Sequence, residues 1–302
     1  MKLRGAIPVM AAPYHEDESI DEDGLRKQVD FAIGKGAAAV CAPGFGTEFY
    51  KLSDPERYRV ADVVLEHTAR RKPVIISTGS GSVYNTIEFS RYAEKHGADC
   101  LMVLPPRITP LTLKEVIRFY ERVADSVSIP IMIQDADFTG TGIPPKVYAD
   151  LSKRLPNLKF AKLENPLPGT KCAEIIRESE GRLQVVFGLW GIYMADGLPK
   201  GAGGIMAGPG IVEVYARIIS LFDEGKAEES RRLLYRNMPY LTFCLQHLES
   251  GLALDKRMLK RRGILRNEIL REPHLHLAET NGEEMDALIE LGLALCKEVA
   301  AT

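Results

Sequence analysis

Cysteine is scarce in this 302-residue chain, and its five cysteines are scattered without a CxxC pair. An odd set of isolated cysteines argues against a disulfide framework and is typical of buried, reduced thiols. The chain also has no apolar run of about 18 residues, the length that a membrane helix needs. Its N-terminus, residues 1–5, lacks the apolar stretch of a signal peptide. We therefore expect a cytoplasmic protein with no membrane partner.

An excess of charge of one sign is missing as well. The 39 Lys and Arg residues nearly balance the 41 Asp and Glu residues, which leaves a net charge of −2. This balance gives no long-range attraction to nucleic acid, so we expect no nucleic-acid partner. GxGxxG, P-loop and HExxH motifs are also absent. His274 and His276 form the only close histidine pair, and we expect no metal site there.

The feature that the chain does contain is a short apolar run followed by an amphipathic stretch, repeated along most of its length. The apolar runs span residues 6–10, 38–41, 74–77, 100–104, 130–133, 158–163, 183–187 and 202–206. Strands that alternate with helices are parallel, because parallel neighbours need a crossover connection. Near-continuous apolar strands indicate burial on both faces. About eight such units predict an α/β fold, a (β/α)8 TIM barrel, over residues 1–224.

Beyond residue 207 the pattern changes to helices only. Helical spacing covers residues 212–224, 227–246, 252–262 and 282–300. The first of these helices can complete the last barrel unit. No proline-rich or serine-rich linker separates the rest. Residues 225–302 are therefore expected to form a helical appendage that packs tightly on the barrel.

The sixth predicted strand carries the clearest chemical signal. Because side chains alternate along a strand, Phe160, Lys162 and Glu164 lie on one face. Active sites of such barrels gather at the C-terminal ends of the strands, where Lys162 and Glu164 lie. If that face lines the lumen, desolvation favours the neutral lysine amine, which is a nucleophile, and Glu164 is placed to move protons. The alternative interpretation is an ordinary ion pair at a strand end.

Other strand ends supply candidate substrate-binding residues, each with a structural alternative. In the glycine-rich turn 44–48, Thr47 and the backbone N–H groups of Gly46 and Thr47 could bind a carboxylate, or the segment is a plain turn. Gln134 and Asp135 end the fifth strand, where Gln134 could bind a substrate hydroxyl or the neighbouring strand.

The ends of the seventh and eighth strands add Gly188 and Gly208, which could approach a ligand closely. Trp190, the single tryptophan, either shapes the pocket or packs under the appendage. Arg107 could reach a sugar-acid carboxylate or a neighbouring subunit.

Several segments resemble the dihydrodipicolinate synthase / N-acetylneuraminate lyase family over essentially the whole chain. Residues 5–13, GAIPVMAAP, are similar to its first strand, and residues 44–49, GFGTEF, occupy the place of its Gly-Thr-Thr-Gly-Glu loop. Residues 161–164, AKLE, are similar to its Gly-x-Lys segment. The resemblance implies that Lys162 forms an imine with a 2-keto acid, and that no other cofactor is needed. It also implies a homotetramer or a dimer.

The chain departs from the synthase pattern around this lysine. The family usually ends its fifth strand with a catalytic Tyr-Asn followed by a carboxylate-binding arginine, whereas residues 133–138 read IQDADF. Pro105-Pro106-Arg107 replaces a pair of tyrosines, and Phe45-Gly46 replaces the threonine pair of the loop. Gln-Asp followed by Lys-x-Glu resembles the subgroup that includes 2-keto-3-deoxy-L-arabonate dehydratase, in which a glutamate at the position of Glu164 takes over acid–base work.

The sequence therefore predicts a lyase that dehydrates a 2-keto-3-deoxy sugar acid through a Lys162 imine. An aldolase that cleaves such an acid to pyruvate and an aldehyde is the nearest alternative. Dihydrodipicolinate synthesis is a third, which the missing tyrosine and arginine disfavour. A non-catalytic keto-acid-binding protein is an alternative of a different class.

Overall fold

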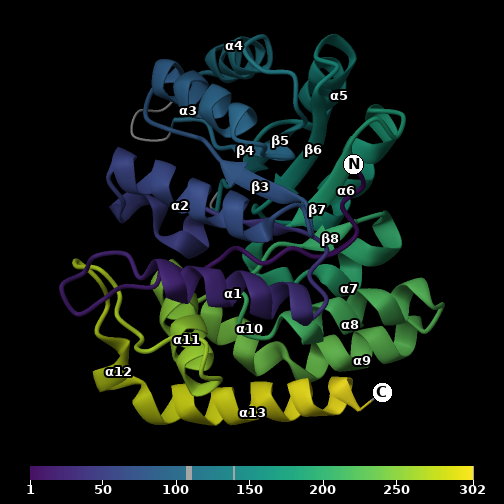
Figure 1. Cartoon of the computed structure of the whole chain (residues 1–302). Helices are drawn as coiled ribbons and strands as arrows, with labels where there is room; N and C mark the ends of the chain where they lie inside the picture. Colours follow the sequence, from purple (N-terminus) through teal and green to yellow (C-terminus); the bar gives the residue numbers. More distant parts are fainter. Residues whose placement is uncertain (107–110, 139, 302) are drawn as a thin grey trace.

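The computed structural model describes residues 1–106, 111–138 and 140–301, and an eight-stranded parallel barrel forms its centre (Figure 1). The strands are β1 (Gly5–Ala6), β2 (Val40–Cys41), β3 (Val74–Ser77), β4 (Cys100–Val103), β5 (Ile131–Asp135), β6 (Leu158–Leu163), β7 (Gln184–Phe187) and β8 (Gly204–Ile205). They pair in the order β1-β8-β7-β6-β5-β4-β3-β2. The ring closes beyond β1, where the Cys41 N–H donates to the Pro8 carbonyl (3.0 Å) and the Met10 N–H donates to the Cys41 carbonyl (2.9 Å). The predicted TIM barrel is confirmed.

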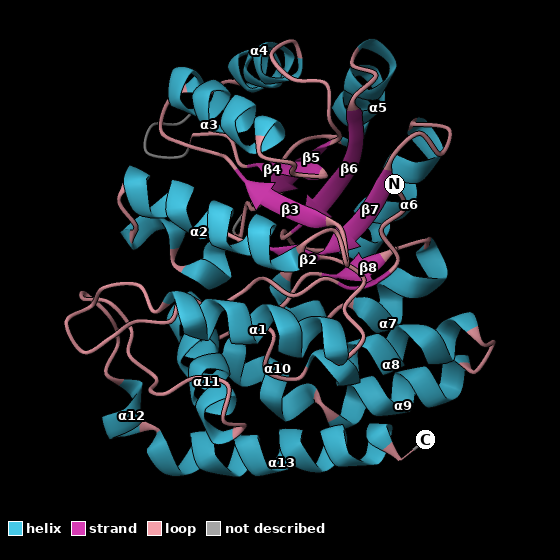
Figure 2. Cartoon of the chain, in the orientation of Figure 1, coloured by secondary structure: helices cyan, strands magenta, loops and turns pink. Residues whose placement is uncertain are grey.

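Helices surround the strands on the outside of the barrel (Figure 2). They are α1 (Glu22–Gly34), α2 (Asp54–Thr68), α3 (Val83–Lys95), α4 (Leu113–Ala124), α5 (Pro145–Arg154), α6 (Pro168–Glu178), the short α7 (Met194–Gly197) and α8 (Val212–Asp223). The 3₁₀ turns are η1 (Phe45–Thr47), η2 (Phe49–Lys51), η3 (Leu189–Gly191) and η4 (Leu198–Lys200).

Local sequence signals set the helix ends. The Ser53 N–H at the start of α2 donates to the Glu56 carboxylate (2.8 Å), and Pro55 lies in the first turn, where its missing N–H costs nothing. After α3, Gly97 takes a φ of +95°, a left-handed conformation that glycine adopts without strain. Both signals are read correctly from the sequence.

The barrel has two apolar layers. Inward-facing side chains fill the lumen with a small cluster that includes Cys41, Met102, Met132 and Phe160. Outward-facing side chains from the same strands join a much larger core beneath the helices. Because both faces of the strands are largely apolar, a polar side chain in the lumen is an exception that needs a specific partner.

The C-terminal appendage consists of α9 (Ala227–Arg236), α10 (Met238–Cys244), α11 (Leu248–Arg261), α12 (Leu277–Thr280) and α13 (Gly282–Ala300). The α13 helix lies along the outside, against α8, α10 and α11 (Figure 1). None of the helices in the described ranges combines the length and apolar character that a bilayer crossing needs.

The prediction of one helix over residues 227–246 is wrong. The helix ends at Arg236 and a new one starts at Met238, because Pro239 has no N–H to donate and its ring would clash with an earlier carbonyl. Proline is tolerated in the first turn of α10, which is where it lies. The next helix, α11, starts earlier than predicted, because the His247 ring accepts the Glu249 N–H (3.2 Å) and caps it.

The appendage and the barrel meet where α11 passes the end of β8. A Cβ atom added at Gly208 would lie 1.1 Å from an Asp255 carboxylate oxygen, and the Gly210 N–H donates to the other oxygen at 3.1 Å. Gly208 therefore packs against α11, and this close packing explains why the position has no side chain. The substrate-binding role of Gly208 stays a prediction.

Burial raises the pKa of the Asp255 carboxyl to about 7, and the Gly210 hydrogen bond offsets only part of this shift. Between the unfolded value near 4 and about 7, the folded chain therefore holds a proton that the unfolded chain has released. The contribution of Asp255 to the free energy of unfolding should decrease as the pH rises through this window.

We predict that Asp255→Asn gains stability relative to the wild type by on the order of 3 kcal/mol when the pH is raised from 4 to 8. Urea unfolding of both proteins across this range measures the difference. Asp125→Asn, at an exposed position, is the control and should show no such trend. A stability difference between Asp255→Asn and wild type that is constant with pH would contradict this account.

Candidate active site

Lys162 and Glu164 lie at the C-terminal end of β6, as the alternation predicts. Phe160 belongs to the lumen cluster, whereas Ala161 and Leu163 belong to the outer core, so Lys162 and Glu164 point inward. Lys162 is only 2% exposed and Glu164 is 6% exposed. A lysine amine is thus held in an almost dry lumen, at the end of the barrel where catalytic groups of this fold gather.

Three polar side chains satisfy one another at this point. The Lys162 Nζ lies 3.0 Å from Glu164 Oε1, and the Gln134 Nε2 donates to Glu164 Oε2 at 2.7 Å. Gln134 on β5 is also the register partner of Lys162. Of the two predicted roles for Gln134, the structure shows the contact with the neighbouring strand, and this contact orients the carboxylate.

Gly188 makes room for the same carboxylate. A Cβ atom at this position would lie 2.3 Å from Glu164 Oε1 and 2.5 Å from its Cδ. A side chain at this position would therefore overlap the Glu164 carboxylate. Gly188 is therefore part of the site, and the contact seen here is with Glu164.

The Cys41 thiol lies near this pair, and no sequence pattern predicts its place there. Burial raises the pKa of Cys41 to about 12, and the Glu164 charge adds to this shift while the Lys162 charge opposes it. The thiol therefore remains protonated at neutral pH. It adds bulk but no charge beside Lys162.

The turn after β2 holds Gly46 and Thr47. The Thr47 hydroxyl donates to the Met10 carbonyl (2.7 Å) and accepts the Gly44 N–H (3.1 Å), and the Thr47 N–H donates to Gly44 (2.9 Å). These contacts fix the turn and occupy both polar groups of Thr47. Within the described ranges, no group accepts a hydrogen bond from the Phe45 or the Gly46 N–H, so these two donors are left to the turn.

Gly46 is needed where the turn crosses the chain that follows β1. A Cβ atom there would lie 2.9 Å from the Val9 carbonyl oxygen. The glycine thus lets the turn pass close over the lumen wall.

A buried ionic network anchors this turn to the appendage. The Glu48 carboxylate, which is 0% exposed, pairs with the Nζ of Lys256 on α11. The Lys51 Nζ lies 3.3 Å from Glu48 and 2.9 Å from Glu249 on α11. Burial lowers the pKa of Lys256 to about 8, although the Glu48 charge opposes the shift. Sequence reasoning missed this network, because Glu48 and Lys256 lie 208 residues apart.

Asp135 lies outside the group formed by Lys162, Glu164 and Gln134, and its substrate-binding role stays a prediction. Adjacent strand residues face opposite sides, so Asp135 points outward when Gln134 points into the lumen. Its Oδ2 accepts hydrogen bonds from the Tyr148 hydroxyl (2.9 Å), the Ile143 N–H (3.0 Å) and the Lys171 Nζ (2.6 Å). It therefore holds β5 to α5 and α6.

Two aromatic rings meet above the strand ends. Phe45 follows β2 and Phe138 follows β5, and their ring centroids are 6.2 Å apart. Because β3 and β4 lie between these two strands, the ring contact reaches across their ends. Trp190 packs against Gly251 of α11, where an added Cβ would lie 2.0 Å from its ring, so it lies under the appendage. Arg107 lies outside the described residues.

The contact between Gly188 and Glu164 predicts a non-additive effect on stability. Gly188→Ala should lower the free energy of unfolding by about 1–3 kcal/mol, because the new methyl group overpacks the carboxylate. In a Glu164→Ala background most of this cost should disappear. Urea unfolding of the four proteins of the cycle measures the coupling.

Gly34→Ala is the matched control, since nothing lies within 4 Å of its added Cβ. An equal cost of Gly188→Ala with and without the Glu164 side chain would show that another neighbour limits this position.

Comparison with known proteins supports one family. The Dihydrodipicolinate synthetase family model matches residues 2–291. The chain is 27% identical over 292 residues to L-2-keto-3-deoxyarabonate dehydratase of Azospirillum brasilense, covering 94% of this chain and 93% of the relative. It is 32% identical over 155 residues, about half of each chain, to the putative 2-dehydro-3-deoxy-D-gluconate aldolase YagE of Escherichia coli.

A crystal structure of a putative dihydrodipicolinate synthetase from Pseudomonas aeruginosa has the same fold, with a TM-score of 0.89 and 24% identity, over 96% of this chain and all of the other. With the barrel, the lumen lysine and this full-length match, the chain belongs to the dihydrodipicolinate synthetase family, whose members are lyases.

Proposed function

We propose that the chain is a Schiff-base-forming lyase that acts on a small 2-keto acid through Lys162. The observation that carries this proposal is the Lys162 amine, buried in the lumen 3.0 Å from the Glu164 carboxylate. A desolvated lysine beside a proton acceptor is the arrangement that attack on a carbonyl needs. The match to a family of lyases supports it.

The proposed reaction is dehydration of a 2-keto-3-deoxy sugar acid. The Lys162 nitrogen attacks the C2 carbonyl carbon. The carbonyl oxygen then leaves as water, and an iminium remains. Glu164 removes a C3 proton, and the C–H electron pair forms the enamine. The enamine expels the C4 hydroxyl, which leaves as water with the proton that Glu164 returns. Water then hydrolyses the imine. The iminium is the electron sink, so we propose no further cofactor.

Two observations favour dehydration within the family. Gln134 replaces the tyrosine of the synthase relay and binds Glu164 instead, which leaves this carboxylate as the acid–base group beside the lysine. The Azospirillum brasilense relative, which matches along almost the whole chain, is a dehydratase of a 2-keto-3-deoxy sugar acid.

Aldol cleavage is the second candidate, and the YagE relative favours it. It would start from the same imine and break the C3–C4 bond instead of the C4–O bond. Assays with 2-keto-3-deoxy sugar acids separate the two, because an aldolase releases pyruvate whereas a dehydratase gives a semialdehyde product.

Imine formation is the first prediction of this proposal. Borohydride reduction in the presence of pyruvate should add a covalent mass to the wild type and to Lys159→Ala, whose lysine lies on the exposed side of β6. Lys162→Ala should gain no mass and lose turnover. Intact mass spectrometry makes the measurement. Absence of an adduct with any keto acid would favour a keto-acid-binding protein without catalysis.

The role of Glu164 gives a second prediction. Glu164→Gln should still form the reducible imine, because the amine is unchanged, but its turnover should fall by about 10²–10⁴-fold, the usual contribution of a placed proton-transfer group. Steady-state kinetics alongside the borohydride assay measure both steps. Normal elimination by this variant would remove Glu164 from the mechanism.

A further inference from the structure

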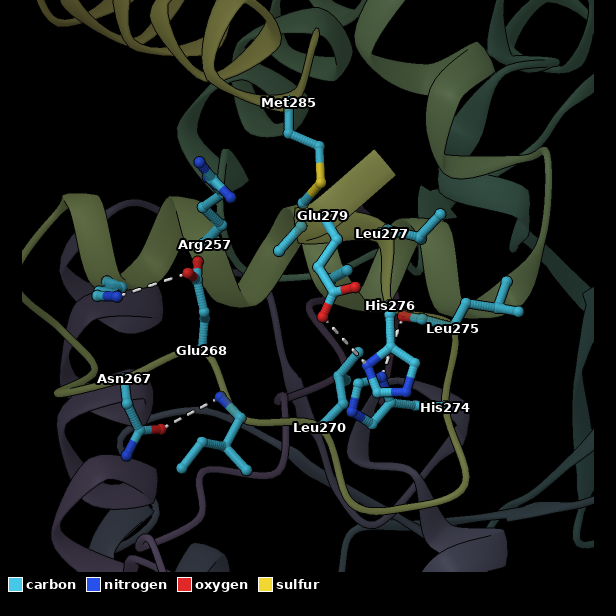
Figure 3. A pocket seen from close by; sticks show the side chains of 14 residues that line it. Arg257, Asn267, Glu268, Leu270, His274, Leu275, His276, Leu277, Glu279 and Met285 are labelled. Atoms are coloured by element: carbon cyan, nitrogen blue, oxygen red, sulfur yellow. Dashed lines mark hydrogen bonds and ion pairs between the residues drawn. The ribbon is translucent and has the colours of Figure 1, made fainter. Parts of the chain in front are cut away.

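A second cluster of chemically capable side chains lies outside the barrel, between α11 and α12. Glu272, His274 and His276 each offer one ligand atom, and these atoms lie within 4.8 Å of one another. Both histidines also line a cavity between α11, α12 and the start of α13 (Figure 3). We propose that this cluster binds a divalent transition-metal ion, with zinc as the best fit. The proposal is independent of the reaction at Lys162.

The spacing of the ligand atoms fits a metal better than it fits hydrogen bonds. Glu272 Oε1 lies 3.4 Å from His274 Nε2 and 3.6 Å from His276 Nε2. Both separations exceed the usual hydrogen-bond length of about 2.7–3.2 Å. Two ligands about 2.0–2.1 Å from a tetrahedral zinc ion lie about 3.3 Å apart, so both match edges of such a tetrahedron.

The hydrogen bond of the His274 ring also favours a role as a metal ligand. Its Nδ1 lies 3.0 Å from the Leu275 carbonyl oxygen, and a carbonyl can only accept, so Nδ1 carries the proton. The lone pair of a neutral His274 is then on Nε2, which faces the Glu272 carboxylate. A metal ion bound to this Nε2 would lie beside the carboxylate. A histidine whose other N–H binds a carbonyl is also the usual form of a metal ligand.

His276 makes only a longer ion-pair contact on its outer side. Its Nδ1 lies 4.0 Å from the Glu279 carboxylate, which leaves Nε2 on the side of Glu272 (Figure 3). The His276 side chain is 58% exposed, so its ring can turn to bring Nε2 closer to the other two ligand atoms.

The backbone of the segment is already held in place. The Leu275 N–H donates to Glu249 at 2.7 Å, and the His274 N–H donates to Glu272 at 3.2 Å. Arg271 forms a two-armed ion pair with Glu56, at 2.7 and 3.0 Å. The ligands therefore come from a fixed segment, which lowers the entropy cost of binding.

The ligand types select the metal. Two imidazoles and one carboxylate suit zinc, copper or nickel, whereas magnesium and calcium prefer oxygen ligands alone. Three protein ligands leave a fourth position for water. The sequence expectation of no metal considered the two histidines alone, and the folded segment adds Glu272 to them.

Titration of the chelator-treated full-length protein with Zn²⁺, followed by calorimetry, tests the site. We expect about one ion per chain, and a binding constant weakened by more than about 100-fold in His274→Ala and in His276→Ala. His96→Gln, at an exposed histidine outside the cluster, should bind as the wild type does.

Two further readouts keep the test decisive. The thermal midpoint of the wild type should rise with Zn²⁺, since a ligand of the folded state stabilises it, and that of His274→Ala should not. Co²⁺ should give the intense visible absorption of a tetrahedral site. No saturable binding, or binding that survives both histidine substitutions in folded variants, would overturn the proposal.

Discussion

A lysine and a glutamate buried together in an apolar lumen are the constraint on which the rest of the site depends. Removing two charges from water is expensive unless they are paired and hydrogen-bonded. Here Lys162 and Glu164 pair with each other, Gln134 binds the second carboxylate oxygen, and Gly188 leaves the space that the carboxylate fills. Lys162, Gln134 and Gly188 therefore all contact or make room for the Glu164 carboxylate.

The synthase pattern has a tyrosine at the end of the fifth strand, whereas this chain has Gln134, and this difference changes which group can move protons. Gln134 has an amide that cannot relay a proton, and it donates to the carboxylate instead. In the proposed reaction the acid–base work therefore falls on one group, which removes a proton from C3 and returns it to the departing hydroxyl. Phe45 and Phe138 also form an apolar contact above the strand ends.

Much of the fold and the centre of the site could be predicted from the sequence, because both follow from local periodicity. The apolar runs predicted all eight strands, and alternation placed Lys162 and Glu164 on one face. The same alternation, applied strictly, would have separated Gln134 from Asp135. The contacts with α11 could not be predicted from the sequence. Gly208 and Asp255, and likewise Glu48 and Lys256, are too far apart in the chain for local periodicity to relate them.

The position of α11 has a consequence for the order in which the molecule can be completed during synthesis. Its neighbouring residues Asp255 and Lys256 contact the chain after β8 and the turn after β2, respectively. In a nascent chain that has all eight strands but has not yet released α11, the Glu48 carboxylate has Lys51 beside it but lacks Lys256. The barrel's catalytic end therefore takes its final form only after the strands are made, when a helix outside the barrel arrives.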